Sequence, residues 1–176
     1  TVGYLEGFYY RPRIDMKILE EYSDGLICLS GCLKGIIPEK MLKGDYEGAR
    51  ESAVKFSEIF PDRFYLEIQN HGIPEEEQNI INMKKLSDEL NLPLVCTNDA
   101  HYSKKNHSDA HDIHICLGTG KERSDPNRLR YATPEFYFKT QDQMHNLFKS
   151  FPTAIENTRR IADSIELELP MGEYHL

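Results

Sequence analysis

Apolar positions along the chain fall into short continuous runs and longer stretches with helical spacing. The runs at residues 25–31, 64–69 and 92–97 have the length and apolar content of buried strands. Between them, residues 45–60 and 75–90 repeat apolar side chains at the spacing of an amphipathic helix. Because strands and helices alternate, the sequence predicts an α/β fold with a mainly parallel sheet.

Further elements are predicted outside this central pattern. In chain order they are a loop over residues 5–13, a helix from Asp15, a helix over 107–116, a loop over 118–130, a strand over 136–139, and helices over 140–148 and 152–165. Pro12 favours the first loop because it restrains the residue before it. Thr140 has the side chain of a helix N-cap.

The run at residues 92–97 ends abruptly in polar residues. Asp99 and His101 follow it two positions apart, so an extended chain would place both side chains on one face. Ligands of α/β folds bind at the carboxyl ends of parallel strands. The pair could hold a divalent metal or act as base and orienting group, or Asp99 could cap a loop in which His101 packs. The residues alone leave these interpretations open.

Other strand ends and one helix also carry candidate ligands. Cys32 follows the run at 25–31 and is a candidate thiolate ligand or an inert thiol. His71 follows the run at 64–69 and is a candidate ligand or a hydrogen-bonded loop residue. Helical spacing of four and three residues places three histidines on one face, where they could bind a metal or be packed and solvated: His107, His111 and His114.

Charge and composition limit the function classes. The chain has 176 residues and a net charge of -8, which excludes a general electrostatic binder of nucleic acid and leaves only local contacts with DNA. No apolar stretch approaches the ~20 residues of a membrane span, and no leader is visible. We therefore expect a cytoplasmic protein with free thiols and no membrane association. The opening residues read like the middle of a longer protein, so a fragment is expected.

Five motifs, in the same order and over nearly the full length, resemble the bacterial DNA polymerase III alpha subunit family. They are Gly-Phe-Tyr-Tyr-Arg-Pro-Arg at 7–13, Leu-Ser-Gly-Cys at 29–32, Asp-Arg-Phe-Tyr-Leu-Glu at 62–67, Thr-Asn-Asp-Ala-His-Tyr at 97–102, and residues 119–128. The resemblance implies that residues 1–150 are the later part of a PHP (polymerase and histidinol phosphatase) domain, a distorted, TIM-like β/α barrel. It implies that residues 151–176 lead toward a palm domain.

The resemblance also implies site residues. Cys32, Asp99 and His101 correspond to ligands of a cluster of divalent metal ions, which would be zinc, manganese or magnesium. The family's His-x-His motif and its other ligands have no equivalent in this chain, so we expect an incomplete site. Arg11 and Arg13 become candidate phosphate contacts, and His71 a candidate outer-shell residue. The polymerase aspartates are absent as well.

Metal-dependent phosphodiester hydrolysis of the 3'-5' exonuclease type is the activity that the resemblance implies for the intact replicative polymerase. DNA and other replicase subunits are the implied partners. Two alternatives are a stand-alone PHP phosphoesterase and a non-catalytic module that braces the polymerase or binds a partner. Open sheet edges in a partial barrel also predict self-association of the chain.

Overall fold

A three-stranded parallel sheet forms the centre of the protein in the computed structural model, which describes residues 2–168 and 171–172. Its strands are β3 (Cys28–Leu29), β4 (Phe64–Ile68) and β5 (Leu94–Cys96), in the order β3-β4-β5. Cys28 pairs with Phe64 and Leu66 with Leu94. The predicted parallel sheet is confirmed, and it is consistent with part of a PHP barrel.

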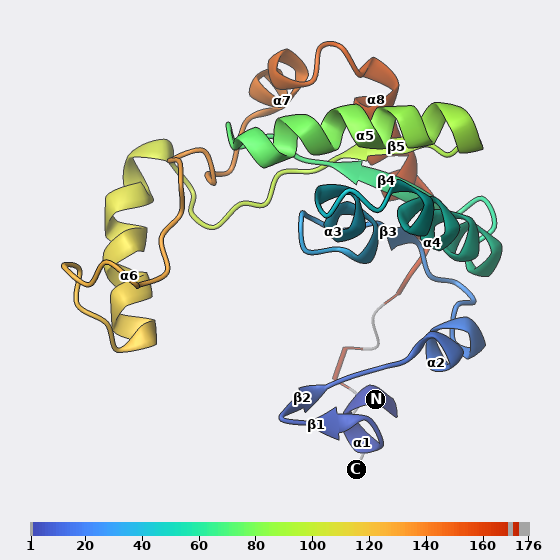
Figure 1. Cartoon of the computed structure of the whole chain (residues 1–176), viewed down its shortest axis with the longest axis horizontal. Coiled ribbons are helices and arrows are strands. Elements are labelled where there is room, and N and C mark those ends of the chain that lie inside the picture. Colours follow the sequence, from blue (N-terminus) through green and yellow to red (C-terminus); the bar gives the residue numbers. More distant parts are fainter. Residues whose placement is uncertain (1, 169–170, 173–176) are drawn as a thin grey trace.

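Four helices cover this sheet: α3 (Ile36–Leu42), α4 (Tyr46–Ile59), α5 (Pro74–Leu90) and α8 (Pro152–Asp163). Helix α5 packs against β4, α8 packs against β5, and α3 lies against α4 and α5 (Figure 1). The Asn157 side chain of α8 donates to the Leu94 carbonyl at 2.7 Å, which fixes α8 on β5. Buried residues of the strands and helices form one apolar core, including Phe60, Phe64, Leu66 and Met83.

The two long predicted helices are confirmed, and local chemistry explains their ends. The Asp45 side chain accepts a hydrogen bond from the Gly48 nitrogen at 3.0 Å, so it caps the first turn of α4. Helix α5 begins with Pro74 in its first turn, where the missing N–H costs nothing. It ends at Asn91, which takes the left-handed conformation with φ 52°.

The amino-terminal region is not the plain loop predicted for residues 5–13. It forms α1 (Val2–Leu5) and an antiparallel hairpin of β1 (Phe8–Tyr9) and β2 (Arg11–Pro12). Tyr10 turns the hairpin with φ 59°. Strands of two exposed residues leave no alternation of apolar and polar positions to read. The next helix, α2 (Met16–Glu21), is confirmed, with Asp15 as its N-cap.

The sequence pattern also missed α3 and overestimated one strand. Pro38 lies in the first turn of α3, where a helix tolerates proline. The predicted strand over 136–139 is wrong: in the described chain Tyr137 makes only an isolated bridge with Tyr102. The predicted helices over 107–116, 140–148 and 152–165 are confirmed as α6 (Ser108–Thr119), α7 (Gln141–Leu147) and α8, and a 3₁₀ turn η1 (Lys105–His107) that was not predicted precedes α6.

The edge strands of the sheet are short, at two residues for β3 and three for β5. Short edges present few unpaired backbone groups to another chain. The predicted self-association through these edges has no support in the described part of the chain. Of the predicted segment 151–176, residues 169–170 and 173–176 lie outside the described residues. Among the helices described, none combines the length and apolar character needed to cross a membrane.

Candidate functional site

Asp99 and His101 lie just beyond the carboxyl end of β5 and face each other. Asp99 Oδ1 is 3.2 Å from His101 Nε2, and the two side chains are 45% and 33% exposed. The backbone N–H of His101 donates to the Phe136 carbonyl at 2.8 Å, which holds this turn against the later chain. The structure therefore brings the two residues together at an accessible sheet edge, although β5 has ended before them.

Tyr131 and His111 complete the surroundings of His101. The Tyr131 hydroxyl is 3.1 Å from each ring nitrogen of His101, so it lies midway between them. Burial, followed by the charge of Asp99, raises the pKa of Tyr131, so its hydroxyl stays protonated at neutral pH. The His111 ring is 5.7 Å from that of His101, and burial together with the nearby His101 charge lowers the pKa of His111.

Cys32 is exposed just beyond the carboxyl end of β3. Strand β4 separates β3 from β5, and neighbouring strands are about 4.8 Å apart, so the ends of β3 and β5 are about 10 Å apart. Among the described residues, no three His, Cys, Asp or Glu side chains are grouped so that they could hold one metal ion. Cys32 therefore does not join Asp99 and His101 around a single point.

Glu67 links the two strand ends, and it is not among the predicted site residues. It is only 8% exposed at the end of β4. Its carboxylate accepts from the Gly31 nitrogen at 3.1 Å and from the Thr97 hydroxyl. One side chain thus fixes the residue before Cys32 and the end of β5. A glutamate in the otherwise apolar run at 64–68 is the sequence signal that could have identified it.

His71 is buried rather than open to a ligand. Its ring Nδ1 is 2.7 Å from Glu76 Oε1, and its ring stacks on Phe136 at 4.1 Å. Arg11 and Arg13 lie on the exposed amino-terminal hairpin, with Arg13 over the Tyr9 ring. Phe136 contacts both His71 and His101, whereas the contacts of the described residues do not connect Arg11 and Arg13 to Asp99 and His101.

The three histidines at helical spacing do not converge. His107 precedes α6 at its N-cap position, His111 packs among Tyr102, Tyr131 and His101, and His114 is exposed. Only His111 therefore faces the strand-end residues. Within the described chain, these histidines also take part in no group of three ligands around one ion.

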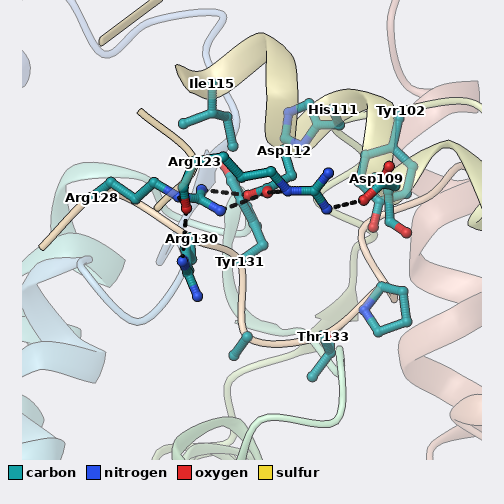
Figure 2. Close-up of a pocket in the computed structure, with 13 residues that line it drawn as sticks. Tyr102, Asp109, His111, Asp112, Ile115, Arg123, Arg128, Arg130, Tyr131 and Thr133 are labelled. Atoms are coloured by element: carbon teal, nitrogen blue, oxygen red, sulfur yellow. Dashed lines mark hydrogen bonds and ion pairs between the residues drawn. The ribbon is translucent and has the colours of Figure 1, made fainter. Parts of the chain in front are cut away.

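A cavity of about 420 Å³ lies beside His101, between α6 and the chain that follows it. Arg123, Arg128 and Arg130 line it together with Tyr131. Figure 2 shows the guanidinium groups of Arg123 and Arg128 converging on Asp112, with Arg130 next to them. The Arg128 side chain is 3% exposed and binds both Asp112 oxygens, at 2.5 and 2.6 Å.

The donor types present fit a metal site in part. A carboxylate, an imidazole and a thiol are ligands of zinc, and the first two also suit manganese. Asp99 and His101 are close enough to share an ion. Cys32 follows β3, and β4 separates β3 from the strand that precedes the other two ligands. The described chain thus offers two adjacent ligands and one separate ligand.

Comparison with known proteins identifies the family that the chain resembles. The PHP domain family matches residues 1–71. DNA polymerase III subunit alpha of Borreliella burgdorferi is 48% identical over 94% of the chain, and that of Campylobacter jejuni is 42% identical over 97%. The Thermus aquaticus subunit is 39% identical over 97%. The chain is a segment of this alpha-subunit family.

The alpha-subunit segment is a small part of the whole relatives. It spans 14% of the Borreliella burgdorferi protein and 15% of the Campylobacter jejuni protein. The match runs through both the strand ends and α6, so the resemblance found in the motifs is confirmed. The family match places residues 1–71 in a PHP domain, and the predicted boundary at residue 150 stays a prediction.

Proposed function

We propose that this alpha-subunit segment supplies part of a metal-dependent phosphodiesterase site in a replicative DNA polymerase. Asp99, His101 and Cys32 would hold divalent metal ions, zinc, manganese or magnesium, with ligands from elsewhere in the intact protein. The pairing of Asp99 with His101 at 3.2 Å, at the carboxyl edge of a parallel sheet, is the observation that carries the proposal.

The spacing of the ligands favours more than one ion. Cys32 follows β3 and the other two ligands follow β5, so one ion would not contact all three. Such ions, when bound, would polarise a phosphodiester and lower the pKa of a bound water. The chain's own residues orient the site: Glu67 fixes the ends of β3 and β5, and Tyr131 holds the His101 ring.

The substrate proposed is the 3' end of a DNA strand, cleaved in the 3'-5' direction. DNA polymerisation itself would require residues of the intact subunit, and so would binding of other replicase subunits. DNA as a substrate is supported by the printed name of the relatives, DNA polymerase III subunit alpha. The chemistry of the Asp99 and His101 pair supports metal-dependent hydrolysis.

A non-catalytic role is the second candidate, and it is favoured because no three possible metal ligands group together among the described residues. If the ligands never share a metal cluster, the sheet and its helices would brace the polymerase or bind a partner. In either case, residues 151–176, which begin with α8, would lead toward a palm domain. A stand-alone PHP phosphoesterase is less favoured, because the similarity to polymerase subunits extends over 94% or more of the chain.

The test uses the full-length polymerase subunit that contains this segment. We expect Asp99→Asn and His101→Ala each to lower bound metal and to reduce 3'-5' exonuclease activity at least ~10²-fold, because both remove a ligand. Polymerase activity should stay unchanged. Metal analysis and release of nucleotides from a mispaired primer measure the effects.

The matched controls are Asp142→Asn and His145→Ala, both exposed on α7 and outside the strand ends. Exonuclease activity that survives both site substitutions would overturn the catalytic proposal and leave the bracing role. Loss of activity in the controls as well would show damage to the fold instead of the site.

A further inference from the structure

The cavity beside His101 has a charge unlike that of the rest of the chain. Arg123, Arg128 and Arg130 line it, against the carboxylates of Asp109 and Asp112. Three arginines and two aspartates leave one positive charge, whereas the whole chain carries -8. A local positive cavity in an acidic protein is a feature that attracts anions.

The ion pairs leave Arg130 as the unmatched charge. Arg128 binds both oxygens of Asp112, and Arg123 pairs with Asp109 and lies 3.5 Å from Asp112. Arg130 forms no ion pair with any carboxylate of the described residues. Its guanidinium donates one hydrogen bond within the described part of the chain, to the Arg123 carbonyl at 3.1 Å, which leaves its other N–H groups without a partner among those residues.

Other groups of the cavity suit an anion as well. Ser108 and Asp109 belong to the first turn of the 12-residue helix α6, and no side chain caps that turn. The Ser108 N–H already donates to the Lys105 carbonyl of η1, so the positive end of the helix dipole is what favours negative charge here. Tyr131 borders both this cavity and the Asp99 and His101 pair, so an anion here would lie beside the proposed metal ligands.

We propose that this cavity is a phosphate-binding subsite, with Arg130 as its principal contact and Arg123 as a second. A guanidinium binds phosphate through two parallel N–H donors, which an ammonium cannot reproduce. The cavity of about 420 Å³ is large enough for a nucleotide-sized group. The inference rests on the proposed function in that the phosphate would belong to the substrate cleaved beside Asp99.

The test measures binding by the 176-residue chain in EDTA, so neither metal nor turnover is involved. Inorganic phosphate is titrated by NMR at constant ionic strength, and a labelled single-stranded dT12 is titrated by fluorescence anisotropy. Arg130→Gln should weaken binding about tenfold, because it removes a charge-assisted hydrogen bond. Arg130→Lys should recover only part of the loss.

A second substitution has the opposite expected sign. Asp109→Asn removes the nearer carboxylate that pairs with Arg123 and leaves the longer 3.5 Å contact with Asp112, so it should tighten binding about threefold. The charge-matched controls are Arg159→Gln and Asp163→Asn, which break an exposed ion pair on α8. They should leave both affinities within about twofold.

Each outcome decides the assignment. An effect of Arg130→Gln on phosphate identifies a free phosphate ester as the ligand source, and an effect on dT12 alone identifies the DNA backbone. Unchanged affinity for both probes, equal weakening by Arg159→Gln, or no tightening in Asp109→Asn would overturn the subsite. Failure of the proposed metal site would instead appear as exonuclease activity that survives Asp99→Asn and His101→Ala, while Arg130→Gln would still weaken binding of the probes.

Discussion

The carboxylate of Glu76 lies within hydrogen-bond distance of two groups of His71. It accepts from the His71 backbone nitrogen at 2.6 Å and lies 2.7 Å from the ring Nδ1. The two side chains are 5% and 1% exposed. Glu75, Glu76 and Glu77 all suit the positive end of the α5 dipole, and Glu76 in addition accepts a hydrogen bond from a buried residue.

We predict that Glu76→Ala lowers the free energy of unfolding by about 3 kcal/mol, because it leaves buried donors of His71 without a partner. Glu77→Ala, in the same first turn but exposed, should change it by less than about 0.5 kcal/mol. Urea unfolding followed by circular dichroism measures both. Equal effects would mean that the dipole, and not the buried pair, explains the acidic turn.

Elements with strong local chemistry were predictable, and elements held by tertiary contacts were not. Helices α4 and α5 have long apolar faces and clear end signals, so periodicity identified them. Helix α3 has seven residues and a proline, and it exists because Ile37 and Met41 are buried in the core. Residues 136–139 have the apolar content of a strand, but only one bridge forms there because no neighbouring strand is present in the described chain.

Helix α7 illustrates a terminus that the sequence did specify. Thr140 accepts from the Gln143 nitrogen at 3.3 Å, and the Gln143 side chain accepts from the Thr140 nitrogen at 2.8 Å. We predict that Thr140→Ala destabilises the chain by about 1 kcal/mol, because a capping box loses half of its hydrogen bonds.

The matched control for the cap is Thr158→Ala in the interior of α8, whose hydroxyl donates to the Ile155 carbonyl and to no other described residue. Its effect on the free energy of unfolding should be close to zero, because alanine favours the helix interior. Thermal and urea unfolding compare the two variants. A Thr140→Ala effect no larger than that of the control would contradict the cap's contribution.

At the scale of the whole molecule, contacts between residues that follow the same strand were predictable, and contacts between separate segments were not. Asp99 and His101 were predictable as a pair because two residues after one strand remain neighbours in any packing. The distance to Cys32 depends on strand order, which places β4 between β3 and β5. His111, Tyr131 and the arginine cavity come from segments up to 30 residues later, as the Tyr131 to His101 contact shows.

Helix α6 lies away from the sheet at the whole-molecule scale (Figure 1). Cys116 is its one buried residue among those described, and the main apolar core contains no α6 side chain. The Asp112 to Arg128 pair instead holds α6 to the following loop. Elements with few buried apolar contacts open at lower free energy than the core. Amides of α6 should therefore exchange with solvent before those of α5.

We predict that Asp112→Asn accelerates amide exchange in α6 about tenfold and leaves α5 unchanged, because Arg128 loses its ionised partner.

Hydrogen bonds from Arg128 lower the pKa of Asp112 below its ordinary value of about 3.9. The stabilisation is therefore complete above that value and is lost as pH falls through the lower, folded-state pKa. NMR signals of α6 should differ between Asp112→Asn and the wild type at pH 7 and become alike in acid. Asp88→Asn, on the exposed face of α5, should match the wild type at every pH. Convergence already at neutral pH would show that the aromatic and histidine contacts, and not this ion pair, hold α6 in place.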